Sequence, residues 1–68
     1  MTDAVSMLRL QADLINGECR ILNLAVAVCD TNNLPETARS IRLTITILRE
    51  AATLIKREAD HLEELDSK

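Results

Sequence analysis

Two stripes of polar residues, each repeating every three or four positions, run along the two halves of the chain. The first contains Thr2, Ser6, Arg9, Asp13, Asn16, Arg20, Asn23 and Asp30, and the second contains Arg39, Arg42, Thr46, Arg49, Thr53, Lys56, Asp60, Glu63 and Ser67. This spacing is typical of one face of an α-helix, so both halves are predicted to be helical. Each stripe covers about 140° of a helix and leaves about 220° that is mostly apolar. One neighbouring helix covers only about half of such an arc, so the pattern predicts packing against a further surface.

The periodicity breaks once, near the middle of the chain. We expect a first helix over about residues 4–30, a turn over 31–34 and a second helix over about 35–65. A connection this short makes the two helices antiparallel neighbours. Residues 1–68 are therefore predicted to form a single helical-hairpin domain.

Capping residues support these boundaries. Asp3 is expected to cap the first helix, and Asn33 with Glu36 three residues later resembles a capping box for the second. Pro35 then falls in the first helical turn, where its missing N–H costs nothing. Gly17 lies in the middle of the first helix at a cost of about 1 kcal/mol relative to alanine. Either it is simply tolerated, or it lets a neighbouring helix approach closely.

Residues 43–47 conflict with the helical pattern, because they alternate between apolar side chains and threonine and are rich in β-branched residues, which favours a strand. We still predict a helix there. No turn residue interrupts residues 36–68, and the polar stripe passes through Thr46 in phase. A lone strand would also have no partner.

The apolar arc of each helix divides into two seams. In the first helix one seam contains Leu8, Ala12, Ile15, Cys19, Leu22, Val26 and Cys29, and the other contains Met7, Leu10, Leu14, Ile21, Leu24 and Val28. In the second helix one seam contains Ile41, Ile45, Leu48, Ala52, Ile55, Ala59 and Leu62, and the other contains Leu43, Ile47, Ala51, Leu54 and Leu65. Two seams per helix predict an all-α fold, an antiparallel hairpin that dimerises into a four-helix bundle. The alternatives are a larger oligomer and a heteromer in which the partner is the target protein. The main dimer and core positions are Leu8, Leu14, Ile15, Ile21, Leu22, Ile41, Ile45, Leu48, Ile55 and Leu62.

Chain length and cysteine content also favour an oligomer. A chain of 68 residues is marginal as a monomer unless disulfides, a metal or a partner supports it. Cys19 and Cys29 would lie roughly 15 Å apart on one helix, too far for a disulfide within the chain. Free thiols, no signal-like leader and no bilayer-length apolar run favour a cytoplasmic protein without a membrane partner.

Gln11 and Glu18 are the most unusual polar residues, because they lie between the two apolar seams of the first helix. A carboxylate there would face the axis of a bundle, where an unpaired charge is costly. We expect these two side chains to fix the arrangement of the subunits. Each would contact the same residue of the second copy, or Glu18 would contact Gln11 or Thr44. The alternatives are a site for an arginine of another protein, and a solvated edge.

Arg39, Arg42, Arg49 and Lys56 form a basic ribbon along the second helix. It is either a solvated face, a site for an acidic protein or a contact for phosphate groups. A formal net charge of −3 and the absence of Phe, Tyr and Trp disfavour nucleic acid, since base-stacking surfaces need aromatic rings.

Glu58 and His61 form the Glu-x-x-His motif that some metal-binding bundles use, which leaves a metal-binding bundle as an alternative. The sequence supplies no clear further ligands, so no cofactor is expected. No histidine lies within helical reach of either cysteine, and the single glycine excludes a glycine-rich phosphate loop. We therefore expect no enzymatic activity.

In length, charge and predicted architecture the whole chain resembles the hairpin regulators typified by the plasmid copy-number protein Rop, which dimerise into four-helix bundles. It also resembles small phage-encoded helical proteins that bind bacterial regulators. No motif carries either resemblance, so no functional residue is transferred. Together these features predict a homodimeric regulator that binds and inhibits another protein. The alternative is a Rop-like regulator that binds RNA or DNA through the basic ribbon.

Overall fold

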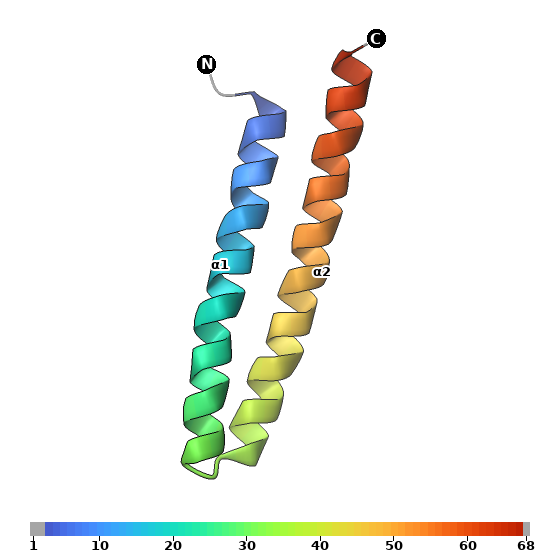
Figure 1. Ribbon diagram of the computed structural model, residues 1–68. Helices are drawn as coiled ribbons and strands as arrows, with labels where there is room; N and C mark the ends of the chain where they lie inside the picture. The colour runs from blue at the N-terminus through green and yellow to red at the C-terminus, as the bar shows by residue number, and fades with distance from the viewer. Residues whose placement is uncertain (1–2, 68) are drawn as a thin grey trace.

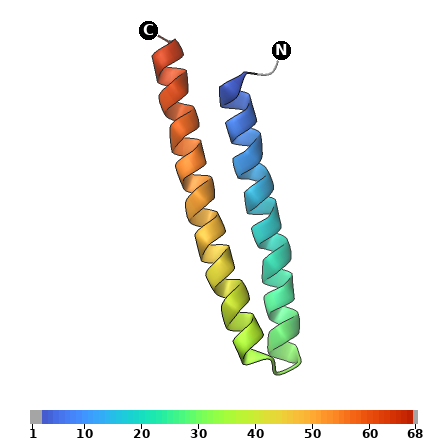
Figure 2. The same ribbon diagram turned by 180° about the vertical axis from the view of Figure 1, so that it is seen from behind.

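The computed structural model describes residues 3–67 and shows two long helices that pack side by side. Helix α1 spans Ala4–Thr31 and helix α2 spans Pro35–Asp66. The two termini lie at the same end of the molecule and the turn lies at the other (Figures 1 and 2). The predicted antiparallel hairpin is therefore confirmed. Thr2, the first residue of the predicted polar stripe, lies outside the described residues.

The N-terminus of α1 is capped as predicted. The Asp3 carboxylate accepts a hydrogen bond of 2.7 Å from the backbone N–H of Ser6. This bond satisfies one of the amide groups that has no partner within the helix, and it lowers the pKa of Asp3 below its usual value.

The predicted capping box at Asn33 is wrong, because this residue ends α1 instead of starting α2. Its φ angle is 59°, in the left-handed region. The N–H of Asn33 donates to the carbonyl of Asp30, and the N–H of Leu34 donates to that of Cys29 at 2.8 Å. This is the Schellman arrangement, which needs a left-handed residue after the helix. Leu34 becomes the N-cap of α2, without a side-chain bond, and Pro35 follows at the start of the helix as expected.

Residues 43–47 are helical, as predicted. The hydroxyls of Thr44 and Thr46 donate to the carbonyls of Ser40 and Arg42 one turn earlier, at 3.0 and 3.2 Å. A threonine can occupy a helix in this way because its hydroxyl finds a backbone acceptor without leaving the helical conformation.

Two seams with seven-residue spacing hold the helices together. In α1 the inner seam consists of Val5, Leu8, Ala12, Ile15, Cys19, Leu22, Val26 and Cys29, and in α2 it consists of Ala38, Ile41, Ile45, Leu48, Ala52, Ile55, Ala59 and Leu62, all of them buried or half-buried. Many of the buried residues are small, and Ala12, Ala38 and Ala59 have no exposed surface. Small side chains allow the helices to pack closely along a seam that pairs one residue set from each helix.

The molecule is one helix layer thick. Its principal dimensions are 54 × 19 × 10 Å, and its radius of gyration is 15.8 Å. A compact chain of this length is expected to have a radius of gyration of about 11 Å. Each helix therefore has one neighbour, and the rest of its surface is open.

Candidate interaction surfaces

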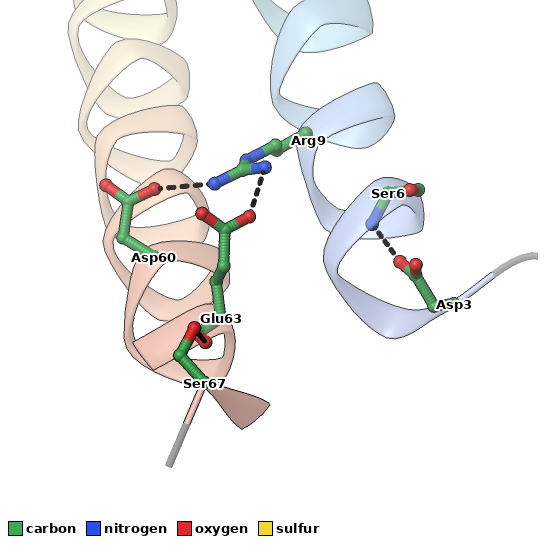
Figure 3. A network of polar contacts seen from close by, with 6 residues as sticks. All are labelled: Asp3, Ser6, Arg9, Asp60, Glu63 and Ser67. Carbon is green, nitrogen blue, oxygen red and sulfur yellow. Dashed lines mark hydrogen bonds and ion pairs between the residues drawn. The ribbon is translucent and has the colours of Figure 1, made fainter. Parts of the chain in front are cut away.

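The two polar stripes lie next to each other on one side of the hairpin, which we call the polar face. At the open end the Arg9 guanidinium reaches from α1 across to α2, where it bonds to Glu63 at 2.8 Å and to Asp60 at 3.1 Å (Figure 3). The hydrogen bonds with Glu63 and then with Asp60 raise the pKa of Arg9. This fork connects the ends of the two helices where no turn joins them.

Two members of the predicted basic ribbon form ion pairs with α1. Arg42 lies 2.7 Å from the Asp30 carboxylate near the turn, and Lys56 lies 3.6 Å from Asp13 nearer the open end. All four side chains are about half exposed or more, so each pair adds little to stability. Their main effect here is to neutralise half of the ribbon.

Arg39 and Arg49 are exposed and have no ion pair among residues 3–67. The positive charge that remains available on the ribbon therefore lies on the half of α2 nearest the turn.

A depression of about 290 Å³ on the polar face is lined by Arg9, Asp13, Lys56 and Asp60. Each of its cations is already paired with one of its carboxylates. The depression therefore presents no free charge to a ligand.

The order of charges along the two polar stripes explains the ion pairs between α1 and α2. The sequence analysis did not predict these pairs. Along α1 the charges of the stripe are Arg9, Asp13, Arg20 and Asp30 in that order, whereas along α2 the stripe begins with basic residues and ends with acidic ones. When the helices run antiparallel, Arg9, Asp13 and Asp30 each meet a residue of opposite charge. The change of sign near residue 58 could have predicted the ion pairs.

Opposite its inner seam, α1 carries an apolar stripe that contacts no other helix. Its members are Met7, Leu10, Leu14, Ile21, Leu24 and Val28, which are between 45% and 69% exposed. We call this set the outer stripe of α1. It is displaced from the inner seam by two residues, which is a rotation of about 200° around the helix. Leu14 and Ile21, two of the predicted dimer and core positions, belong to it.

The other eight predicted dimer and core positions all lie in the inner seams. They are Leu8, Ile15, Leu22, Ile41, Ile45, Leu48, Ile55 and Leu62, of which only Ile45 is fully buried in the single hairpin.

Helix α2 has an outer apolar stripe with fewer members. It consists of Leu43, Ile47, Leu54 and Leu65, which are between 53% and 63% exposed. Glu50 and Arg57 interrupt this surface. The exposed apolar surface of the hairpin is therefore most continuous on α1.

Gln11 and Glu18 are both exposed in the hairpin. They lie beside the outer stripe of α1, on the side away from the polar face. No polar side chain among residues 3–67 is buried between the two helices. A role for these residues in subunit arrangement requires a second copy, so it stays a prediction.

The motif formed by Glu58 and His61 is exposed towards the end of α2. No group of three or more metal-ligating side chains gathers anywhere in the described part of the chain. Cys19 and Cys29 are free and buried between the helices, and the Cys19 thiol lies 3.9 Å from the carbonyl oxygen of Ile45.

Neither described helix combines the length and the apolar character needed to cross a bilayer. Comparison with known proteins found no match to a family model, to a curated protein or to a solved structure. The interaction surfaces must therefore be interpreted from their own chemistry.

Proposed function

We propose that this chain is a small, non-enzymatic interaction protein that dimerises into a four-helix bundle and binds another protein, which it inhibits. The observation that carries the proposal is the exposed aliphatic surface. Among residues 3–67, eleven large hydrophobic side chains are at least 45% exposed. A single chain that stayed alone in water would leave this surface uncovered at a cost in solubility.

The exposed area supports the dimer. A folded monomer of 7.6 kDa is expected to expose about 4,300 Å². The hairpin exposes 5,292 Å². The excess of roughly 1,000 Å² is similar to the surface that one partner buries in a protein–protein interface of standard size, about 800 Å².

The free part of the basic ribbon and the outer stripe of α2 are the surfaces that we assign to the second protein. Arg39 and Arg49 supply unpaired positive charge on the same helix that exposes Leu43, Ile47 and Leu54. An arginine beside aliphatic side chains suits an acidic protein surface with an apolar centre. A nucleic-acid ligand is less favoured, since Arg42 and Lys56 are already paired with carboxylates of α1.

The test is affinity capture from a bacterial lysate with the wild-type chain and with an Arg39→Glu/Arg49→Glu variant. These two arginines are chosen because they have no ion pair within residues 3–67, so their reversal leaves the hairpin intact. Asp66→Lys, an exposed charge reversal at the open end of α2 that belongs to neither assigned surface, is the control.

A protein captured by the wild type and the control, and lost with the double variant, supports the proposal. Failure to capture any protein would contradict it. Capture of RNA or DNA in place of protein, with a salt-sensitive affinity lost in the double variant, would replace it with the nucleic-acid alternative.

A further inference from the structure

The outer stripe of α1 is symmetric about Gly17. Leu14 and Ile21 lie three and four residues from this glycine, and Leu10 and Leu24 lie seven residues from it. Met7 and Val28 extend the same spacing to both ends of the helix. An antiparallel copy of α1 therefore presents apolar side chains at the same levels along the whole stripe.

We infer that the partner of this stripe is the outer stripe of α1 in a second copy, packed antiparallel with Gly17 near the two-fold axis. The inference rests on the dimer proposed above and defines which helices form its central contact. Each α1 would then lie between its own α2 and the second α1.

Gly17 is the first observation that supports this arrangement. A Cβ atom built at this position meets nothing within 4 Å in the hairpin, and its φ angle is not positive. Neither backbone geometry nor packing within the chain requires glycine, although glycine lowers helix stability. A second helix that crosses at Gly17 would benefit from it, because the absence of a side chain lets two backbones approach.

The charges beside the stripe supply the second observation. Asp13 and Arg20 each immediately precede a stripe residue, so both lie on the same side of it. In an antiparallel dimer Asp13 of each copy, whose carboxylate is also 3.6 Å from Lys56 of its own chain, lies near Arg20 of the other. A parallel dimer would set this side of the stripe against the opposite side of the other copy, which carries Gln11 and Glu18, and would form no such pair. Residues that flank an antiparallel seam already pair in this way within the hairpin, where Asp30 meets Arg42.

The length of the contact is the third observation. Six aliphatic side chains span α1 from Met7 to Val28 without an intervening charge on the stripe itself. The outer stripe of α2 has only four, and it is interrupted by Glu50 and Arg57. Pairing α1 with α1 therefore covers the most apolar surface with the least desolvation of charge.

Cysteine cross-linking tests the orientation directly. Leu10→Cys and Leu24→Cys chains, one of them labelled with ¹⁵N, are mixed, allowed to exchange subunits and oxidised. Both sites are exposed, so neither change disturbs the inner seam. Antiparallel packing brings position 10 of one copy to position 24 of the other, whereas parallel packing separates them by roughly 21 Å.

Mass spectrometry then gives three readable outcomes. A predominance of the mixed Leu10→Cys–Leu24→Cys disulfide supports the inference. A dimer that forms only like-with-like disulfides, or none, overturns the inference and leaves the proposed dimer standing. A folded monomer under the same conditions overturns both. The wild type, whose cysteines are buried, is the control for background oxidation.

The second test introduces a charge near the proposed two-fold axis. Gly17→Lys gains helix propensity and meets no atom of its own chain, so the hairpin keeps its fold. It places two ammonium groups in the proposed contact, and we expect the dimer to weaken by about tenfold or more because buried unpaired charge is costly. Asn23→Lys adds the same charge on the exposed polar face of α1 and should change the dissociation constant by less than about twofold. Equal effects of the two variants would contradict a contact at Gly17.

Discussion

At the scale of single residues, Asp3 couples the start of α1 to pH. Its carboxylate bonds to the Ser6 amide, which lowers its pKa in the folded chain. Because this pKa is lowered, the ionised Asp3 carboxylate stabilises the fold at pH values above its ordinary pKa of 3.8. The stabilisation is lost as the pH falls through the pKa of Asp3 in the folded chain. We predict that the first turn of α1 frays in acid, measured by amide NMR of residues 4–7. Asp3→Asn keeps a capping oxygen at every pH, so its first turn should show no such step below pH 4.

Asn33 is the residue on which the turn depends. Its positive φ is strained for an alanine side chain and free of strain for glycine. Asn33→Ala should therefore reduce the free energy of unfolding by about 1 kcal/mol, whereas Asn33→Gly should leave it unchanged or raise it slightly. Urea unfolding followed by circular dichroism measures both. Equal stability of the two variants would exclude the left-handed turn.

The two caps also show what local sequence can predict. Asp3 was identifiable because an aspartate directly before the first residues of a helical pattern is a strong N-cap signal. Asn33 and Glu36 have the spacing of a capping box. In the structure, however, Asn33 adopts the left-handed conformation that ends α1 and does not cap α2. Only one backbone conformation is possible at Asn33, and the Schellman bonds of the preceding helix determine it.

At the scale of helices, the small residues of the inner seam set how closely α1 and α2 pack. Ala52 is 1% exposed. Ala52→Leu should lower the free energy of unfolding by about 1–3 kcal/mol, because the added side chain has no space between the helices. Ala27→Leu makes the same change on the exposed surface of α1 and should cost less than about 0.5 kcal/mol. Thermal unfolding of the pair measures the difference, and similar losses would contradict the close packing.

The periodicity predicted both helices and the division of each apolar arc into two seams. It could not predict which seam faces the other helix, since both seams are aliphatic and similarly spaced. In the structure the seam richer in alanine and cysteine is the inner one. Small side chains let two helices of one chain approach, which leaves the larger leucine and isoleucine side chains of α1 outside.

At the scale of the whole molecule, Glu18 distinguishes a self-associating hairpin from an isolated one. It is exposed in the hairpin, immediately after Gly17. With Gly17 near a two-fold axis, the Glu18 carboxylates of the two copies approach each other and repel. Glu18→Gln should therefore tighten the dimer several-fold at neutral pH, measured by sedimentation equilibrium. Glu50→Gln, an equal charge change at an exposed position of α2, should have a smaller effect.

The candidate interaction surfaces were only partly readable from the sequence. The basic ribbon could be read from the sequence as a row of four residues, Arg39, Arg42, Arg49 and Lys56. The ion pairs of Arg42 with Asp30 and of Lys56 with Asp13 could not, because they depend on how the two polar stripes lie side by side. That placement follows from the antiparallel packing of the inner seams. The identity of a second protein depends on its own surface, which this chain does not encode.

Sedimentation velocity of the wild-type chain from low to high micromolar concentration is the most direct test of this account. Because α1 exposes a full-length aliphatic stripe, we predict a species of twice the 7.6 kDa chain mass that dissociates on dilution. A well-folded 7.6 kDa monomer that persists across the whole concentration range would contradict the central claim that a second copy covers this stripe.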